Sequence, residues 1–394
     1  MNFPLRAALA LVTAALLAGT PGTRAVAQPA PYTIDAVMEL TGSNAFIGSV
    51  YSASLRALEA YVNSHGGING TPLKINFLDD QTNPQIAVQL ASQVIAKNPA
   101  VFFGGAQTAS CAAVAPLAKN GPLDFCISPG YFPEPNGYVF ASAASLRYII
   151  NADIRFMRGQ GWHKLAVINP TDATGQSSDK TIAQLLALPE NRDITLVTSQ
   201  QFSPADISVT AQAQKIKDSG ADAIFCFAGG TPFGTVLRGL NDVGVALPVI
   251  SSSANINVAQ LDQYKSFVPS KLYFNGLIYV APEELSRSSR VPVDTFLEAF
   301  KTAGQTVTPG SGIAWDPAWI TVAALRKLGT SATAKQLRDY LLTLHDFNGA
   351  MGTYDYRIGD QHGLTESSVV EVRWDPNTHT FTTASKPGGG PLKR

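Results

Sequence analysis

The feature that most constrains this chain is a regular alternation of short apolar segments with longer amphipathic ones. Residues 33–40, 72–80 and 100–105 are rich in β-branched or aromatic residues and end in glycine or acidic turns, which predicts strands. Residues 49–65 and 84–97 lie between them and repeat apolar side chains at three- and four-residue spacing, which predicts helices. Strands joined by helices form βαβ units, so we expect a parallel sheet with helices on both faces.

The same alternation starts again near residue 164 and continues almost to the end of the chain. The further predicted strands are 164–170, 194–202, 222–229, 247–253, 271–280, 367–375 and 380–385. The further predicted helices are 177–188, 206–220, 233–244, 294–304, 314–329 and 334–344. We therefore expect an α/β fold of two doubly wound parallel-sheet lobes, which the C-terminal third returns to complete. The glycine-rich end after residue 387 is expected to fray.

The N-terminus predicts export. Arg6 precedes the short apolar run 7–19, and Ala25-Val26-Ala27 carries small residues where a signal peptidase cleaves, so residues 1–27 are expected to be a signal peptide. No cysteine follows the run, which indicates a free periplasmic protein without a lipid anchor. Removal of residues 1–27 leaves 27 basic against 29 acidic residues, a balance that offers no basic surface to nucleic acid.

The three cysteines are Cys111, Cys126 and Cys226, and an odd count in an oxidising compartment suggests one bridge. Cys111 begins a helix that leaves one edge of the sheet, and Cys126 ends the strand that returns to that edge. We expect a Cys111–Cys126 disulfide with Cys226 free and buried. Two small packed thiols remain the alternative.

The chain carries none of the common catalytic motifs: no G-x-S-x-G, H-E-x-x-H, C-x-x-C, Walker A or G-x-G-x-x-G. The five histidines are scattered and are interpreted as solvated loop residues; they are His65, His163, His345, His362 and His379. Asp79-Asp80 is interpreted as a cap on the turn before the next helix. We expect neither an enzyme nor a cofactor or metal site.

A binding site is better supported. In open α/β sheets, ligands lie beyond the carboxyl ends of the strands, against helix N-termini that favour anions. Gln107, Thr108 and Ser110 follow the strand at 100–105, although Thr108 could also be a simple helix N-cap. The next strand, 123–127, delivers the loop 128–132 to the same edge, where the rings of Tyr131 and Phe132 could line an apolar wall or could simply pack. Pro116 should distort the helix that begins near Thr108.

The order of these motifs resembles the type I periplasmic binding proteins of ABC importers, in the branch of the leucine/isoleucine/valine-binding protein. The matching stretches are ELTGSNAFIG (39–48), NSHGGINGTPLKINFLDDQTNP (63–84), FFGGAQTASCAAVAPLAKNGPLDFCISPG (102–130), AWITVAALRKLG (318–329) and FNGAMGTYDY (347–356). The resemblance implies two lobes that close on a ligand by a hinge, with three chain crossings near 142–145, 281–282 and 356–362. It places the first lobe at 28–143 plus 282–357 and the second at 144–281 plus 358–394.

The family's binding residues match this chain only in part. The resemblance places the carboxylate-binding hydroxyl on Thr108, but Phe132 replaces the family threonine of the next loop, and Ile47 and Thr174 replace family aromatics. The acid that neutralises a ligand ammonium is expected after residues 247–250, where the sequence reads Ser251-Ser252-Ser253. The ligand-binding residues expected on this basis are Phe46, Ile47, Gln107, Thr108, Ser110, Gly130, Tyr131, Phe132, Thr174, Gly229, Ser253 and Trp315.

We therefore expect the extracytoplasmic receptor of an ABC importer, working as a monomer with a membrane permease as its partner. A small carboxylate with an aromatic or other apolar body is favoured over an amino acid, because an unpaired ammonium would be costly to bury. The rings of Phe46, Tyr131, Phe132, Phe233 and Trp315 are expected near the cleft, with two or three of them touching the ligand. Asp172 could replace the missing acid. An amino-acid receptor, a periplasmic sensor and an exported enzyme are the alternatives.

Overall fold

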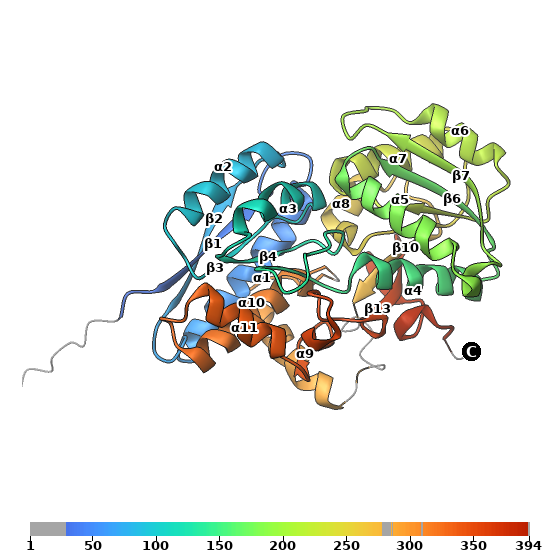
Figure 1. The fold of residues 1–394 in the computed structure, drawn as a ribbon. Coiled ribbons are helices and arrows are strands. Elements are labelled where there is room, and N and C mark those ends of the chain that lie inside the picture. Colours follow the sequence, from blue (N-terminus) through green and yellow to red (C-terminus); the bar gives the residue numbers. More distant parts are fainter. Residues whose placement is uncertain (1–28, 278–284, 286, 309, 393–394) are drawn as a thin grey trace, which may run out of the picture.

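The computed structural model describes residues 29–277, 285, 287–308 and 310–392, which form two α/β lobes side by side (Figure 1). The first lobe contains a parallel sheet in the order β2-β1-β3-β4-β5. Its strands are β1 (Tyr32–Met38), β2 (Leu73–Asp79), β3 (Val101–Phe103), β4 (Leu123–Cys126) and β5 (Val139–Ala141). The signal peptide expected at 1–27 lies outside the described residues.

Helices cover both faces of the first sheet. They are α1 (Ala45–Ser64), α2 (Pro84–Ile95), α3 (Thr108–Val114), α9 (Arg287–Thr302), α10 (Gly312–Leu328) and α11 (Ala334–Thr343). Helices α1, α9, α10 and α11 pack on the face that carries Ile34 and Ala36 of β1, whereas α2 and α3 pack on the face that carries Val37. Successive strand residues thus face opposite layers, which explains the continuous apolar runs in the sequence.

The second lobe has a sheet in the order β14-β13-β10-β9-β8-β6-β7, in which β13 runs antiparallel to β10 and β14. Its strands are β6 (Lys164–Pro170), β7 (Thr195–Phe202), β8 (Ala223–Cys226), β9 (Val249–Ser251), β10 (Leu272–Leu277), β13 (Val369–Asp375) and β14 (Thr380–Thr383). Its helices are α4 (Leu146–Gly159), α5 (Ala173–Leu186), α6 (Thr210–Asp218), α7 (Gly230–Asp242) and α8 (Val258–Gln263). Helices α4 and α5 cover one face, and α6, α7 and α8 cover the other.

The chain passes between the sheets where β5 is followed by α4, and again where the short hairpin β11 (Phe347–Asn348) and β12 (Thr353–Tyr354) of the first lobe leads to β13. The crossing expected near 281–282 lies outside the described residues. The lobe limits 28–143 plus 282–357, and 144–281 plus 358–394, stay a prediction.

Most predicted strands match the structure within a few residues, and β6 matches at both ends. The structure adds β5, α4, α8 and the hairpin β11–β12, which the sequence pattern did not predict. Helix α1 begins four residues earlier than predicted, at Ala45. Pro116 has the expected effect, since the α-helix stops at Val114 and continues as one 3₁₀ turn, Ala115–Ala118.

The cysteines have the arrangement expected from the sequence. Cys111 and Cys126 form a disulfide, with their Cα atoms 5.7 Å apart, and Cys226 is free and buried. This bridge ties the start of α3 to the end of β4, next to the carboxyl edge of the first sheet. Among the described residues, none of the helices is long and apolar enough to cross a lipid bilayer.

Candidate functional site

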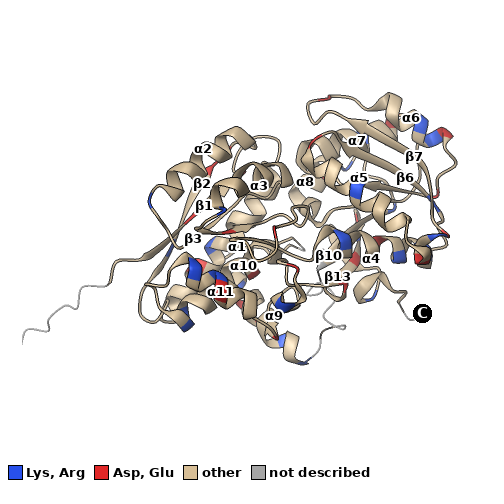
Figure 2. Ribbon diagram, viewed as in Figure 1, with Lys and Arg blue, Asp and Glu red and all other residues tan. Residues whose placement is uncertain are grey.

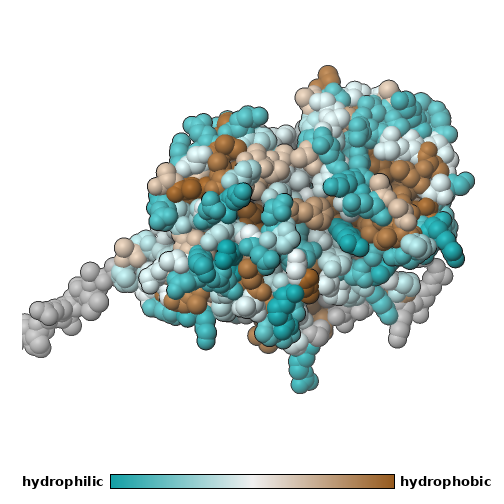
Figure 3. Space-filling view, viewed as in Figure 1, coloured by the Kyte–Doolittle hydropathy of each residue, from teal (hydrophilic) through white to brown (hydrophobic). Residues whose placement is uncertain are grey.

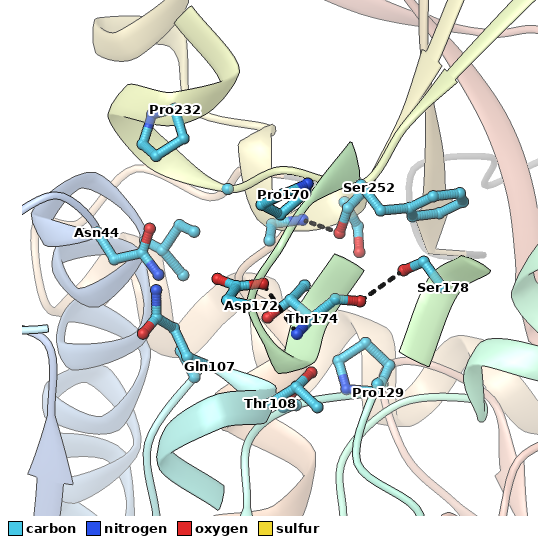
Figure 4. A pocket seen from close by; sticks show the side chains of 18 of the residues that line it. Asn44, Gln107, Thr108, Pro129, Pro170, Asp172, Thr174, Ser178, Pro232 and Ser252 are labelled. Atoms are coloured by element: carbon cyan, nitrogen blue, oxygen red, sulfur yellow. Dashed lines mark hydrogen bonds between the residues drawn. The ribbon is translucent and has the colours of Figure 1, made fainter. Parts of the chain in front are cut away.

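A cavity lies between the lobes, at the carboxyl ends of both sets of parallel strands (Figure 4). Four helices and one 3₁₀ turn begin at its wall, with Asn44, Gln107, Asp172, Gly229 and Ser252 as their N-cap residues. The atom-free space is about 810 Å³, including the part open to solvent. The position is typical of small-molecule sites in α/β proteins.

Both lobes build the wall. The first contributes Ser43, Asn44, Ile47, Tyr51, Ala106, Gln107, Thr108, Ser128, Pro129, Gly130 and Ile313. The second contributes Leu146, Pro170, Asp172, Thr174, Ser178, Pro204, Phe227, Gly229, Pro232, Ser252, Ser253 and Ala254. Hydroxyl and amide groups therefore alternate with apolar side chains, and a molecule held here would contact both lobes at once.

Hydrogen bonds join the lobes across the cleft. The bridges run from Thr231 N–H to Ser43 O (3.0 Å), from Asn257 Nδ2 to Phe46 O (3.1 Å) and from Ser177 Oγ to Gly130 O (2.8 Å). The surfaces of the two lobes are accordingly in contact in the space-filling view (Figure 3). The structure therefore represents a closed arrangement.

The first lobe presents neutral hydrogen-bonding groups to the cavity. Thr108 and Ser128 are both buried, and their hydroxyl oxygens lie 3.1 Å apart. The side-chain amides of Asn44 and Gln107 point into the space between the lobes (Figure 4). Helix α3, which carries Thr108, has no charged residue and is tan throughout in Figure 2. This wall can donate hydrogen bonds to an anion or a carbonyl group without a basic side chain.

The backbone amides just before α3 have another partner. Ala106 N–H and Gln107 N–H are donated to the Glu39 carboxylate, at 2.9 and 3.1 Å from Oε1. Glu39 is fully buried at the end of β1, and burial together with the nearby Asp80 raises its pKa to about 7. These two amides are therefore not available to a ligand anion, because the protein's own carboxylate occupies them.

The second lobe supplies the charge. Among the described residues of the wall, Asp172 alone is charged. Its Oδ1 accepts hydrogen bonds from Thr174 N–H (3.0 Å) and Gly175 N–H (3.1 Å), which caps α5. Its side chain points across the cavity toward Asn44 and Gln107 (Figure 4). A negative group on an otherwise neutral wall favours a ligand that brings a positive group to this side.

The serine run forms the remaining side of the second-lobe wall. The Ser251 hydroxyl donates to Cys226 O inside the lobe, whereas Ser252 caps the turn that follows it and lines the cavity. Ser253 also lines the cavity, and its N–H donates to Asn275 Oδ1 at 2.8 Å. No acid stands at the serine run, and Asp172 approaches the cavity from α5 instead.

The structure brings part of the predicted set together. The predicted residues that line the cavity are Ile47, Gln107, Thr108, Gly130, Thr174, Gly229 and Ser253. The predicted residues outside its wall are Phe46, Ser110, Tyr131, Phe132 and Trp315. Ser110 is fully buried, with its hydroxyl 3.5 Å from Asp80 Oδ2, so it serves the interior of the first lobe.

The predicted group of aromatic rings does not form. Trp315 is 1% exposed in the core of the first lobe, between Phe296 and Trp319, and Phe233 lies in the core of the second lobe. Tyr131 packs against the apolar cluster of α2, α3 and the adjacent strands, outside the cavity wall, while Phe132 is 47% exposed beside His362. Phe46 contributes its backbone carbonyl to a bridge between the lobes. The rings that line the cavity belong instead to Tyr51 and Phe227.

One smaller prediction needs correction and another is confirmed. His362 is fully buried, with Nδ1 2.6 Å from Asp360 Oδ1, whereas the other histidines are exposed as expected. Asp79 and Asp80 accept backbone N–H groups from the turn between β2 and α2, as predicted, and Asn83 is the N-cap of α2 itself.

Sequence reasoning missed several wall residues, including Asn44, Ser128, Pro170 and Phe227. Asn44 has a signal that could have revealed it. A helix placed from its apolar spacing alone began too late, whereas asparagine before an apolar stretch is a common helix start. Ser128 directly follows the predicted strand 123–127, and Phe227 lies inside the predicted strand 222–229 but directly follows β8 in the structure, at the edge where ligands bind in such folds.

Known proteins support this picture. Over residues 31–379 the chain matches the family described as "Periplasmic binding protein". It is 24% identical over 85% of its length to an amino acid binding protein of Pseudomonas aeruginosa (88% of that protein), and 25% identical over 63% to Leu/Ile/Val-binding protein homolog 3 of Brucella melitensis (68% of that protein).

Solved structures show the same fold. An extracellular ligand-binding receptor from Rhodopseudomonas palustris superposes with a TM-score of 0.79 at 18% identity, covering 90% of this chain and 99% of the other. A branched-chain amino acid transporter substrate binding protein from Streptococcus pneumoniae, in complex with isoleucine, has a TM-score of 0.73 at 16% identity, covering 89% and 97%. With a match that spans nearly all of the described residues, the chain belongs to the periplasmic binding protein family, whose members bind ligands and are not enzymes.

Proposed function

We propose that this protein is the extracytoplasmic solute-binding receptor of an ABC importer of the branched-chain amino acid type, and that it captures a small carboxylate between its lobes. The observation that carries the proposal is the cavity whose wall comes from both lobes while hydrogen bonds hold the lobes together. A ligand in such a cavity stabilises the closed form, because only that form offers it both walls. The names of the Pseudomonas and Brucella relatives also support the proposal.

The carboxylate of the ligand would lie against the first lobe. Thr108 and Ser128 offer hydroxyl groups there, and Gln107 and Asn44 offer side-chain amides. Each of these groups can donate a hydrogen bond to a carboxylate oxygen. The backbone amides of Ala106 and Gln107 are bound by Glu39 and are not counted among the donors.

The part of the ligand beyond its carboxylate distinguishes two ligand classes, an amino acid and an aromatic or other hydrophobic acid. The sequence favoured an aromatic or other hydrophobic acid without an ammonium, but Trp315, Phe132 and Tyr131 lie outside the cavity wall. Asp172 faces the cavity, and a purely anionic ligand would be repelled by it. An amino acid brings an ammonium that pairs with Asp172, so the wall supports the amino-acid alternative better than the aromatic acid.

Titration calorimetry distinguishes the two classes. The panel consists of leucine, isoleucine, phenylalanine, benzoate and 3-phenylpropenoate, each titrated into protein freed of bound ligand by unfolding and refolding. We expect an amino acid to bind best, and D172N to weaken that binding at least tenfold, because one buried charge pair is lost. Tight binding of either aromatic acid that D172N leaves unchanged or strengthens would support the other class.

A gene deletion tests the partner. We propose that the receptor works in the periplasm, as a monomer, and delivers its ligand to a membrane permease. Loss of ligand uptake in the deletion strain would support the importer. A lost behavioural or transcriptional response with intact uptake would indicate a periplasmic sensor instead.

A further inference from the structure

The turn of residues 104–107 folds around a carboxylate that belongs to the protein itself. Glu39 follows β1, has no exposed surface, and accepts Ala106 N–H at both of its oxygens (2.9 and 3.0 Å). Gln107 N–H adds a third contact at 3.1 Å. Gly105 leaves room for the approach, since a Cβ there would lie 2.8 Å from Glu39 Oε1.

This turn sets the position of the first-lobe wall. Gln107, whose amide N–H binds Glu39, is the N-cap of α3, and its side chain points into the cavity (Figure 4). Thr108 follows as the first residue of the helix and places its hydroxyl beside Ser128. A change in the Glu39 contacts would therefore move two groups that face the ligand, although Glu39 itself does not line the cavity.

The charges around Glu39 come from three other elements. Asp80, at the end of β2, is the nearest acid, and it accepts hydrogen bonds from Thr82 N–H (2.9 Å) and Ser110 Oγ (3.5 Å). Tyr51 of α1 interacts with Glu39 and lines the cavity, and Asp172 of α5 faces the cavity from the opposite lobe. Two buried acids thus stand together without a basic residue among the described side-chain contacts of Glu39.

We propose that Glu39 is a positioning residue for ligand binding: its ionised carboxylate holds the amides of Ala106 and Gln107, aims Gln107 and Thr108 into the cavity, and makes the affinity depend on pH. The inference rests on the proposed function only in assigning a ligand to the cavity. A protonated Glu39 keeps one oxygen as an acceptor and turns the other into a donor that faces Ala106 N–H. Since the pKa of Glu39 is raised to about 7 by burial and by Asp80, this change falls near neutral pH.

The test compares the wild type with E39Q between pH 5.5 and 8.5. The introduced glutamine has the same shape as a protonated glutamate but does not titrate, so the affinity of E39Q for leucine should be flat over this range. At pH 8 we expect E39Q to bind leucine about tenfold more weakly than the wild type, as for the loss of a hydrogen bond to a charged group. Near pH 5.5 the wild-type affinity should have fallen to within about threefold of the variant. Asp172 is present in both proteins, so its contribution to the leucine affinity is the same in both.

A second measurement needs no ligand. Hydrogen exchange at Ala106 and Gln107 in the ligand-free wild type should be slow at pH 8 and should speed up, after correction for intrinsic rates, as the pH falls through 7. If leucine fails to bind the wild type, the proposed ligand class fails while this measurement still tests Glu39. The measurement also stands if E39Q does not fold.

Asp316 provides a matched control. It is also a fully buried acid of the first lobe, it accepts Ala350 N–H and Met351 N–H at 2.8 Å, and it does not line the cavity. D316N should lose stability but keep the wild-type leucine affinity and pH profile. A pH profile that E39Q shares with the wild type, or exchange at Ala106 and Gln107 that is independent of Glu39 ionisation, would overturn the proposal.

Discussion

Removal of the hydrogen bond between Ser177 and Gly130 would isolate the contribution of lobe closure to ligand affinity. Ser177 Oγ donates to Gly130 O at 2.8 Å, from α5 of the second lobe to a loop of the first. This is the one hydrogen bond described for the Ser177 hydroxyl as a donor, and it exists only while the lobes are closed. S177A therefore removes a contact of the closed form and leaves the interior of each lobe intact.

The expected magnitude follows from the net value of one neutral hydrogen bond. Such a bond contributes about 0.5–1.5 kcal/mol, because water replaces the partner when the lobes open. If the free protein is mainly open, the closed fraction of S177A falls by about two- to thirteenfold, and the apparent ligand affinity falls by the same factor. The unfolding free energy of the ligand-free variant should change by less than about 0.5 kcal/mol.

Calorimetry for affinity and thermal unfolding for stability would measure both quantities, and small-angle scattering would follow closure. Ser92 offers a control, since its hydroxyl donates to Val88 O at the same distance of 2.8 Å inside α2. S92A should leave affinity unchanged. An S177A variant that binds like the wild type, or a radius of gyration that ligand does not reduce, would refute the view that closure across this bond is coupled to binding.

Three further predictions concern the disulfide, the contact between the lobes and the pH dependence of stability. The double variant C111A/C126A should lower the unfolding free energy by about 3 kcal/mol in denaturant titrations, because the bridge closes a loop with a sequence separation of 15; an unchanged midpoint would contradict this. Gly230 has φ +61°, and a Cβ there would lie 2.2 Å from Ser43 O of the other lobe. G230A should therefore weaken ligand binding at least tenfold and lower the unfolding free energy by about 1–2 kcal/mol. An affinity equal to that of the wild type would show that the clash does not occur. Burial raises the pKa of Asp124 to about 8, so the folded protein keeps a proton that the unfolded chain releases above about pH 4, and stability should fall from pH 5 to pH 8. D124N should flatten that decline in melting temperature, and parallel curves for both proteins would count against a protonated Asp124.

Much of the fold could be predicted because it depends on local patterns. Strand β6 and helix α11 have hydrophobic spacing and punctuation that specify both type and limits. Strand β5 has three residues, too few for periodicity to be recognised. Helix α4 has 14 residues, and its buried Leu146, Ile149, Ile150 and Phe156 follow a helical spacing, so this helix could have been predicted and was missed. The antiparallel position of β13 next to β10 depends on long-range pairing, which no local pattern encodes.

The site was predictable where it follows from topology. Thr108 and Thr174 come after parallel strands, so they had to lie at the ligand edge. The prediction failed for the aromatic residues, because whether a ring reaches the cavity depends on which face of its helix or strand it occupies. In the sequence, Trp315 has polar and aromatic neighbours within α10, but its position on the helix directs its side chain into the core against Phe296. Glu39 was missed because an acid at the end of an apolar strand looks like an ordinary turn residue until its amide partners are known.

The hydrogen bonds between the lobes contribute only modestly to closure. Besides the three named above, Thr231 Oγ1 donates to Ser43 O at 3.3 Å, and each bond contributes about 0.5–1.5 kcal/mol net of the hydrogen bonds to water that replace it on opening. A shift from mainly open to mainly closed requires about 5.5 kcal/mol of differential binding. This differential binding must come from ligand contacts that span the cavity, and the wall divides these contacts unequally. The first lobe offers neutral donors around Thr108, and the second offers the charge of Asp172. A ligand that satisfies one wall alone binds the open form as well as the closed form and shifts nothing. Under the proposed function, a molecule with an acceptor at one end and a positive group at the other gains from closure on both walls, so selectivity and closure would depend on the same pair of contacts.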